Sequence, residues 1–496
     1  MSGRILSADT FGNLVEVQCK LTKGLPSMQI VGLGNKAVDE SKERVRAAFH
    51  SLKLPFPKGR ILVNLSPADL PKDGSSYDLS VAYAILVASG AVPIPKKDVL
   101  LFGELSLEGK VVGVRGIIGR LRSMHLASDT VCIIPDQNAT QASLVPDKII
   151  IPIVSLMDLV DISSGAKKPI YSLPGTLAVD KPLTASLFDE VRGQQLAKRA
   201  LQIAAAGNHN ILLFGPPGTG KSMLAKALTE ILPSLTVEEC LESTHIHSLR
   251  SPDYDTLISQ PPLRSPHHSA SNVAILGGGP KARPGEVSLA HNGVLFLDEL
   301  LEFGRSCIEA LRQPLEDRVI HVSRAEHTVT YPASFLMIAT MNPCPCGNLG
   351  SKKECICSGY AIQAYQKKLS GPIADRIDLF VKVDDVGVNS LLDAPVDTNV
   401  ATIRKNVASA RTAQYLRNKG KLNSTLGNSS IRSLSLEPSA RALLESAAEK
   451  MGISPRAYFR VVRVAQTIAD LDQKDTIDDA CIAESLQFRK NMPVNS

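Results

Sequence analysis

The first 160 residues alternate short apolar runs with stretches of helical periodicity. Residues 60–65 (RILVNL), 130–134 (TVCII) and 149–154 (IIIPIV) are short apolar runs that are typical of strands. Residues 37–52 instead carry their apolar side chains at helical spacing. This mixture predicts an α/β domain over residues 1–162.

Two polar intervals divide the rest of the chain. Residues 163–187 and residues 418–435 are rich in small and polar residues and lack hydrophobic periodicity, which predicts linkers. Residues 188–417, between them, contain further strand-like runs. Residues 436–496 contain helix signals, such as the possible N-cap Ser454 followed by proline, and no convincing strand. We therefore expect a central α/β domain followed by a small helical domain.

Length and composition agree with this division. A chain of 496 residues holds about three domains at roughly 100 to 200 residues each. Its 44% hydrophobic and 21% charged residues exclude a largely disordered or fibrous chain. A net charge of +6 permits a polyanionic partner without requiring one. Because no stretch reaches the roughly 18 apolar residues of a spanning helix and no signal peptide is evident, we expect a cytoplasmic protein without a membrane partner.

A phosphate-binding pattern lies in the central region. The sequence GPPGTGKS satisfies GxxxxGK[ST] and stands between the apolar run NILLF and the helical pattern MLAKALTEIL. Glycines let backbone amides turn toward a phosphate, Lys221 can reach the β- and γ-phosphates, and Ser222 can ligate Mg²⁺. The residues predicted to bind ATP here are Gly215, Pro216, Pro217, Gly218, Thr219, Gly220, Lys221 and Ser222.

Two acids follow the next strongly apolar run. The sequence GVLFL leads directly into Asp298 and Glu299, which is the Walker B arrangement. We expect Asp298 to hold Mg²⁺ and Glu299 to deprotonate the water that attacks the γ-phosphate. Alone, such a run is usually a strand that meets a solvated loop, and the P-loop upstream is what favours the catalytic interpretation.

Two further polar residues complete the predicted site. The apolar run SFLMIAT ends shortly before Asn342, whose amide can contact the γ-phosphate or the attacking water, as in sensor 1 of AAA+ ATPases. Arg376, in GPIADRIDL, can supply the cation that neutralises charge during phosphoryl transfer. In AAA+ proteins such an arginine acts on the neighbouring subunit's nucleotide. The alternative for Arg376 is a surface ion pair.

The motifs extend into a family resemblance. Residues 267–302 (HHSASNVAILGGGPKARPGEVSLAHNGVLFLDELLE), continuing through LRQPLED, SRAEHT, MNPCPCG, SGPIADRIDL and SPRAYFRVVRVAQTIADL, resemble the ComM/YifB family of magnesium-chelatase-like AAA+ proteins. The resemblance covers nearly the whole chain. It implies a homohexameric, ATP-driven DNA motor that unwinds or branch-migrates recombination intermediates in natural transformation. The implied partners are single-stranded or branched DNA and recombination proteins.

The same resemblance assigns several parts of the chain. It implies an insert in helix 2 and a hairpin before sensor 1, which fits residues 319–331 (VIHVSRAEHTVTY). Arg324 and His327 near the hairpin tip are the candidate DNA contacts, with a solvated hairpin end as the alternative. Arg456 occupies the position of sensor 2, an arginine near the γ-phosphate. Arg460 and Arg463 lie on nearby helical faces and could take its place.

The N-terminal domain resembles another enzyme without its catalytic pair. Residues from about 21 to 135 resemble the Lon-protease-like domain, which is related to the ribosomal S5 fold. Ser76, in PKDGSSYD, aligns with the Lon nucleophile, but Ile118 takes the lysine position. A serine without a general base is a poor nucleophile, so we expect an inactive domain and keep proteolysis only as an alternative function.

Four cysteines form a separate cluster. Cys344, Cys346, Cys355 and Cys357 have the spacing CxC(x8)CxC, which is sufficient for a tetrahedral thiolate site. Zn²⁺ and reduced free thiols are both open interpretations, because structural zinc sites more commonly use CxxC. A bound metal would stiffen the loop between Asn342 and Arg376.

An ATP site of this kind serves more than one class of substrate. P-loop motors also remodel proteins, so a motor of the magnesium chelatase type is the alternative to a DNA motor. The Lon-like domain and the cysteine cluster fit the ComM/YifB pattern better than the chelatase motor. The DNA assignment rests on the resemblance.

Overall fold

The computed structural model describes residues 3–32, 36–67, 75–122, 130–171, 186–251, 253, 256–279, 282–323, 328–385 and 400–490. The chain divides into two compact units. The first comprises residues 1–178 together with 236–259, and the second comprises residues 179–235 and 260–496. The chain is therefore a mixed α/β protein of more than one domain, as its sequence predicts.

The first unit is built on a mixed sheet. Within the described residues seven strands pair in the order β3-β4-β2-β1-β5-β8-β9, and only the β1–β2 and β2–β4 pairs are antiparallel. These strands are β1 (Ile5–Ala8), β2 (Leu14–Thr22), β3 (Ser27–Val31), β4 (Arg60–Ser66), β5 (Val99–Leu101), β8 (Val131–Pro135) and β9 (Ile149–Ile153). A small ribbon is formed by β6 (Glu104–Leu105) and β7 (Val111–Val112).

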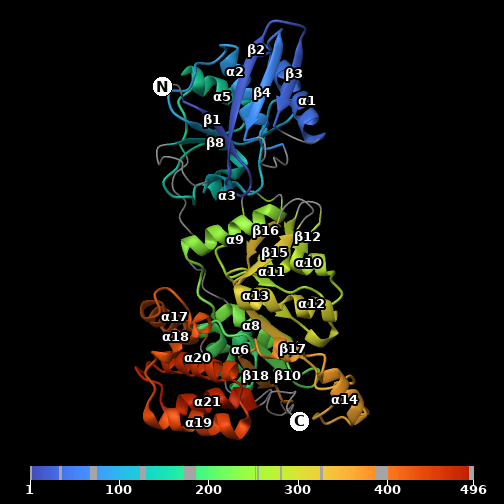
Figure 1. Ribbon diagram of the computed structural model, residues 1–496, viewed down its shortest axis with the longest axis vertical. Helices are drawn as coiled ribbons and strands as arrows, with labels where there is room; N and C mark the ends of the chain where they lie inside the picture. The colour runs from blue at the N-terminus through green and yellow to red at the C-terminus, as the bar shows by residue number, and fades with distance from the viewer. Residues whose placement is uncertain are drawn as a thin grey trace. The chain divides into compact units, whose positions relative to one another are not determined.

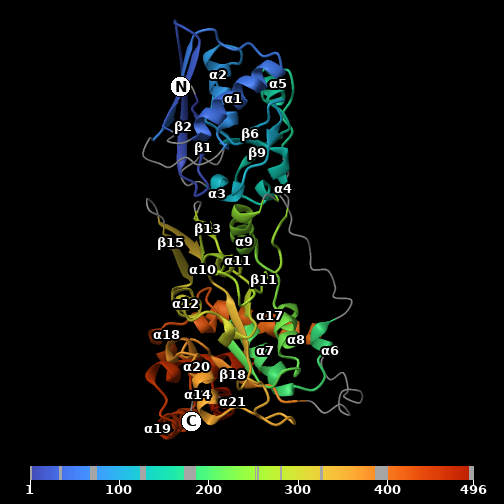
Figure 2. The same ribbon diagram turned by 90° about the vertical axis from the view of Figure 1, so that its right-hand side faces the viewer.

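Helices cover one face of this sheet (Figure 2). Helix α2 (Asp78–Ala88) is almost entirely apolar and packs against the sheet and against α1 (Lys36–Ser51). The remaining helices are α3 (Ile117–Leu121), η1 (Asp136–Asn138), α4 (Ala139–Ala142), α5 (Leu156–Ser164) and α9 (Val237–Arg250). The three predicted strand runs and the predicted helix over residues 37–52 all fall on elements of this unit.

Helix α9 belongs to the first unit although it follows the P-loop helix in the sequence. It packs against α3, where Gly116 and Gly119 have no side chains to hold it away. A Cβ on Gly119 would lie 2.3 Å from the His245 ring, and one on Gly116 would lie 2.9 Å from Leu249. The sequence predicts residues 188–417 as one domain, whereas residues 236–259 pack with the N-terminal residues because these two glycines admit α9.

The second unit contains a parallel sheet between helices (Figure 1). Within the described residues five strands pair in the order β11-β14-β17-β10-β18, and every pair is parallel. They are β10 (Ile211–Phe214), β11 (Leu263–Arg264), β14 (Val294–Leu297), β17 (Leu336–Met341) and β18 (Leu379–Lys382). Strand β17 lies between β10 and β14, although both of those strands precede it in the sequence.

Two short β-ribbons and a set of helices accompany this sheet in the second unit. Two ribbons pair β12 (Gly277–Gly278) with β13 (Arg283–Pro284) and β15 (Val319–Ser323) with β16 (Thr328–Pro332). The predicted hairpin before β17 is thus present. The helices are α6 (Leu187–Glu190), α7 (Gln195–Gly207), α8 (Lys221–Ile231), α10 (Asn272–Leu276), α11 (Glu286–Leu289), η2 (Leu300–Glu302), α12 (Arg305–Ala310), α13 (Arg312–Asp317), α14 (Gly359–Gln366) and α15 (Gly371–Ala374).

The C-terminal part is helical, as predicted for residues 436–496, but its helices begin earlier than predicted, at Val400. It consists of α17 (Val400–Arg417), η3 (Asn423–Thr425), α18 (Asn428–Arg432), α19 (Pro438–Met451), α20 (Pro455–Leu471) and α21 (Asp479–Lys490). Helices α17 and α20 both pack against α7, so this part shares one hydrophobic core with the parallel sheet. Helix α20 begins at the predicted N-cap, where Ser454 accepts a hydrogen bond from the Ala457 amide.

The interval 418–435 is packed rather than extended. Its Asn423 is fully buried, and the side chain donates to Thr467 and to Asp470. Leu426 and Ile431 are also buried. The interval therefore differs from the linker that its polar composition predicts, because asparagine can satisfy its amide inside a helical core through such hydrogen bonds.

Candidate functional site

The predicted phosphate-binding residues gather at one edge of the parallel sheet. The P-loop follows β10, Asn342 follows β17, and Asp298 and Glu299 follow β14. Phe214 lies opposite Met341 in the register between β10 and β17. Because the carboxyl ends of parallel strands meet at the same edge, three separate parts of the sequence converge there.

The P-loop connects β10 to the first turn of α8. Gly218 and Gly220 have φ values of 81° and 85°, a left-handed conformation that glycine adopts without strain. A Cβ on either residue would meet no atom within 4 Å, so both backbones face open space. Gly220 is also the N-cap of α8 and has no side chain to cap it. Within the described residues no side chain of the N-cap occupies this helix start, which is the arrangement that suits a phosphate.

Lys221 lies under this loop. Its ammonium donates to the carbonyls of Gly215 at 2.8 Å and Pro216 at 2.7 Å, and lies 3.4 Å from Oδ1 of Asn342. Burial lowers the pKa of Lys221, while the Asp298 and Glu299 carboxylates oppose that shift. The predicted lysine, acids and amide thus act on one another electrostatically.

A hydroxyl and a carboxylate form the candidate Mg²⁺ site. The Ser222 hydroxyl lies 3.2 and 3.1 Å from the two carboxylate oxygens of Asp298. Hydroxyl and carboxylate oxygens are ligands that Mg²⁺ prefers, so the pair fits the predicted metal.

Sequence reasoning missed Thr340, which joins the two acids. The Thr340 hydroxyl donates to Asp298 at 2.5 Å and accepts from the Glu299 amide at 2.9 Å. Its side chain is buried at the end of β17, only 1% exposed. A signal was present, because Thr340 is a polar residue in an apolar run and lies two positions before Asn342, on the same side of the strand.

Glu299 is held differently from Asp298. It adopts a left-handed backbone with φ of 53°, a conformation that costs a non-glycine residue about 1 kcal/mol. Its side chain is exposed, whereas Leu297 and Leu300 beside it are buried. The geometry places a carboxylate in solvent reach at the edge of the site, which suits a group that accepts a proton from water.

Arg376 lies at the other end of the sheet, before β18. Its guanidinium donates to the Pro372 carbonyl at 2.7 Å and pairs with Glu316. Its Nε is buried and has no hydrogen-bond partner among the described residues. Burial and three nearby positive charges lower the pKa of Arg376, and these charges belong to Arg312, Arg460 and Arg456. Arg376 therefore belongs to a cluster of positively charged side chains, and its Nε can still donate a hydrogen bond to an anion.

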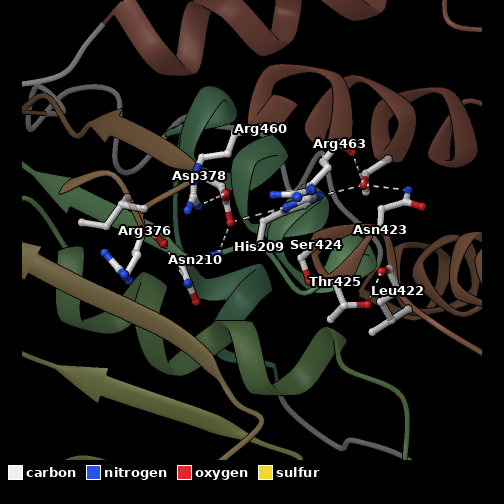
Figure 3. Close-up of polar contacts among 12 residues, drawn as sticks. His209, Asn210, Arg376, Asp378, Leu422, Asn423, Ser424, Thr425, Arg460 and Arg463 are labelled. Atoms are coloured by element: carbon white, nitrogen blue, oxygen red, sulfur yellow. Dashed lines mark hydrogen bonds and ion pairs between the residues drawn. The ribbon is translucent and has the colours of Figure 1, made fainter. Parts of the chain in front are cut away.

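Asp378 lies in one group of polar side chains with Arg376 and with two of the three candidate sensor 2 arginines, Arg460 and Arg463 (Figure 3). Asp378 is buried, and although burial raises its pKa, the positive charge of Arg460 and the contact with His209 hold that pKa well below its usual range. Arg460 donates to this carboxylate at 2.8 Å. Arg463 donates to the Leu426 carbonyl at 2.9 Å.

The positions of these arginines distinguish three candidates. Arg460 is committed to Asp378 and Arg463 to a backbone carbonyl, while Arg456 is exposed. Arg456 lies near enough to Arg376 to influence its pKa. The predicted sensor 2 residue is thus part of the cationic group around Arg376.

The four clustered cysteines converge on one point. Their sulfur atoms all lie within 4.8 Å of one another. Three of the separations are short: 3.5 Å for Cys344 to Cys346, 3.7 Å for Cys344 to Cys355, and 3.7 Å for Cys346 to Cys355. The sulfur atoms of the two CxC motifs therefore lie close enough together to bind one metal ion, which agrees with the metal interpretation of the sequence.

The remaining candidates lie elsewhere. Ser76 is buried, and its hydroxyl has no hydrogen-bond partner among the described residues. Ile118, in the lysine position, is fully buried and apolar. Asp78 is bound by Ser41 at 2.5 Å and by Arg44 at 2.6 Å. The serine therefore has no basic partner in the position where the Lon pattern needs one.

The candidate DNA contacts belong to the hairpin formed by β15 and β16. Strands β15 and β16 pair from Val319 with Pro332 to Ser323 with Thr328. Arg324 and His327, the two candidates, lie outside the described residues. Among the described residues, no helix combines the length and apolar character that a membrane span requires.

The strand order, the P-loop and the two acids define a P-loop nucleotide-binding protein of the AAA+ class. Family comparisons agree: "Magnesium chelatase, subunit ChlI" matches residues 187–391, "Subunit ChlI of Mg-chelatase" matches residues 15–138, and "Magnesium chelatase, subunit ChlI C-terminal" matches residues 397–489. The chain belongs to the ComM/YifB family of magnesium-chelatase-like AAA+ proteins.

Individual relatives cover almost the full chain. "Competence protein ComM" of Haemophilus influenzae is 40% identical over 487 residues, which are 96% of this chain and 94% of that protein. "Uncharacterized protein YifB" of Escherichia coli is 40% identical over 480 residues, with the same coverage. A Lon protease of Dictyoglomus thermophilum is 28% identical over 145 residues, which are 28% of this chain and 18% of that protein.

Proposed function

We propose that this protein hydrolyses ATP with Mg²⁺ and uses the energy to move strands of recombining DNA during natural transformation. The proposal of ATP hydrolysis is supported by four side chains that converge at one edge of the sheet: Lys221, Asp298, Glu299 and Asn342. The DNA half is supported by the 40% identity to a protein named for competence, the state in which cells take up DNA.

Each residue of the site has a distinct part in the proposed reaction. The amides of the P-loop and the Lys221 ammonium bind the phosphates of ATP. Ser222 and Asp298 would hold Mg²⁺, which supplies charge neutralisation at the phosphates when bound. Glu299 accepts the proton of the attacking water, and Asn342 orients that water or the γ-phosphate.

The cationic group around Arg376 supports a ring of identical subunits. Arg376 and Arg456 make no hydrogen bond or ion pair to the P-loop within the described part of the chain, and the buried Nε of Arg376 has no partner there. An ATP γ-phosphate bound by a neighbouring subunit would satisfy this group. We therefore propose a homohexamer in which Arg376 and Arg456 act on the neighbouring subunit's ATP. We also propose that this hexamer works in the cytoplasm.

DNA would be contacted by the hairpin β15–β16, with Arg324 and His327 as the candidate residues. Basic and polar side chains on such a hairpin bind backbone phosphates and carry little sequence information. That property suits a motor acting on any single-stranded or branched DNA. Recombination proteins are the proposed partners.

The N-terminal unit would be an inactive Lon-like scaffold. Its 28% identity to a Lon protease over 145 residues supports the relationship, and the buried Ile118 in the lysine position argues against proteolysis. A casein-degradation assay tests this: wild-type protein that cleaves casein, with loss of cleavage in Ser76→Ala, would make the protease alternative correct.

A second candidate function is remodelling of a protein, as expected for a chelatase motor. It is favoured by the family models, which are those of a magnesium chelatase subunit. ATPase rates with single-stranded, duplex and four-way-junction DNA, measured together with particle mass, separate the two. Stimulation by DNA in a hexameric particle supports the DNA motor, whereas hydrolysis indifferent to every DNA supports a protein substrate.

A further inference from the structure

The four clustered cysteines have the spacing of a bound tetrahedral metal. Zn²⁺ lies about 2.3 Å from each sulfur of a Cys₄ site, so the edges of the sulfur tetrahedron measure about 3.8 Å. Three separations among Cys344, Cys346 and Cys355 are 3.5, 3.7 and 3.7 Å, and Cys357 lies within 4.8 Å of the others. The fit is to a closed, four-coordinate site, which is structural rather than catalytic.

The site is preorganised by its own loop. Cys344 is fully buried, and its sulfur accepts a hydrogen bond from the Leu349 amide at 3.4 Å. Between them Gly347 adopts φ of 79°, which turns the chain back toward the sulfur. The nearest cysteine elsewhere in the sequence is Cys307, so the cluster draws its four sulfurs from one short segment.

One side of this loop contacts the P-loop. A Cβ on Gly347 would lie 2.9 Å from Cδ and 3.2 Å from Cγ of Pro217. The backbone of the cysteine loop therefore rests directly on the proline ring, and no side chain fits between them. Cys344 also follows Asn342 by two residues, and Asn342 lies 3.4 Å from the Lys221 ammonium. The loop thus meets the P-loop at two points.

The other side contacts the segment after Glu299. Helix α14 begins two residues after Cys357, and its Tyr365 is buried against Glu302. Lys368, just beyond the helix, donates to the Leu301 carbonyl at 3.2 Å. Gln366 donates back to the Pro343 carbonyl at 3.0 Å. The cysteine segment consequently links the P-loop to the backbone that carries the acid.

We propose that Cys344, Cys346, Cys355 and Cys357 bind one Zn²⁺, and that this metal holds the P-loop and the Glu299 segment in the arrangement that binds nucleotide. The metal assignment stands on the sulfur geometry alone. The effect on nucleotide rests on the proposed function, because it requires the P-loop to bind ATP. Without the metal, the four sulfurs no longer coordinate a common ion, and the loop loses the crosslink that this ion provides.

The metal is tested on the purified full-length protein. We expect one zinc per chain by elemental analysis, and the strong visible bands of tetrahedral cobalt thiolate when Co²⁺ replaces it. Cys355→Ser with Cys357→Ser is expected to abolish both signals, whereas Cys19→Ser, outside the cluster, keeps them. Wild-type protein without stoichiometric zinc and without the cobalt bands would overturn the metal assignment.

The coupling is tested by binding of mant-ATP with Mg²⁺. The double cysteine variant is expected to bind about tenfold or more weakly while its circular dichroism stays that of the wild type. Gly347→Ala is the second variant, because its Cβ displaces Pro217 without removing a sulfur. We expect it to retain zinc and to bind nucleotide more weakly.

The outcomes separate the two proposals. Unchanged mant-ATP affinity in both the double variant and Gly347→Ala would overturn the coupling. Wild-type protein that holds one zinc but binds no nucleotide would overturn the coupling and the proposed ATPase function together, and would leave the zinc assignment supported. Weaker binding in both variants, with zinc lost only from the first, supports the whole inference.

Discussion

The Thr340 hydroxyl donates a 2.5 Å hydrogen bond to the Asp298 carboxylate, across neighbouring strands of the parallel sheet. The same hydroxyl accepts from the backbone amide of Glu299 at 2.9 Å. One buried side chain on β17 therefore fixes both acids at the end of β14. The position of the candidate base relative to the candidate metal ligand depends on this threonine.

Replacing Thr340 tests that dependence. Thr340→Val keeps the shape of the side chain and removes both hydrogen bonds. The part-buried Asp298 carboxylate then keeps only the Ser222 hydroxyl beside it, and the Glu299 amide loses the Thr340 acceptor, at a cost of about 1–3 kcal/mol for a group left without a partner. We expect kcat for ATP to fall about 10- to 100-fold. Thr340→Ser retains the hydroxyl and is expected to recover most of the rate. Equal kcat in Thr340→Val and the wild type would show that the hydroxyl does not position the acids.

Glu299 is the proposed general base. Glu299→Gln removes the proton acceptor and keeps the size of the side chain, so we expect kcat to fall by roughly 10²- to 10⁴-fold. Binding of mant-ATP and ring assembly are expected to persist, because Lys221 and the P-loop are unchanged. Steady-state phosphate release measures the effect, and normal turnover by this variant would remove Glu299 from the mechanism.

The sequence was informative about this site because each motif is local. The P-loop, the two acids and Asn342 each follow an apolar run, and parallel pairing brings the ends of those runs together. Thr340 could not be assigned from spacing alone, since its role depends on β17 lying between β10 and β14. That order is a property of the whole sheet.

Arg376 is the proposed trans-acting residue. Arg376→Ala is expected to lower kcat by roughly 10³- to 10⁵-fold without changing nucleotide affinity, because the residue acts on the transition state of a neighbour's ATP. Lys221→Ala subunits keep Arg376 but cannot bind ATP normally. Mixed rings of the two variants are expected to recover activity, and mixtures that stay inactive at every ratio would refute the trans role.

His245 gives the first unit a pH-dependent stability. Burial, together with the charges of Arg122 and Arg120, lowers the pKa of His245 to about 4 from the ordinary value of 6.5. The unfolded chain therefore takes up a proton first on acidification, so stability is intact above about pH 6.5 and falls between there and pH 4. The loss is about 2 kcal/mol by pH 5.

The pH effect is measured by urea denaturation at pH 7 and pH 5. Pulsed hydrogen exchange of peptides from α3 and α9 reports the fraction unfolded in that part of the molecule. His245→Gln keeps an acceptor for the Gly119 amide and does not titrate. In this variant the part of the stability loss between pH 7 and pH 5 that is due to His245 is expected to disappear. A stability loss as large as that of the wild type would mean that other groups cause it.

Long-range packing explains what the sequence did not predict. Helix α9 joins the N-terminal unit because Gly116 and Gly119 leave room for it, a complementarity that spans more than 100 residues. The polar sequence around Asn423 predicts a linker, but the Asn423 side chain is buried and donates hydrogen bonds to Thr467 and Asp470. In both cases the deciding partner lies far away in the chain.

ATP-driven movement of a labelled four-way DNA junction tests whether DNA is the substrate of this protein. We expect wild-type protein with ATP and Mg²⁺ to convert the junction into duplex products, and we expect Glu299→Gln to bind the junction without converting it. Wild-type protein that hydrolyses ATP at full rate and leaves every junction and forked duplex intact would contradict the assignment of DNA as the substrate.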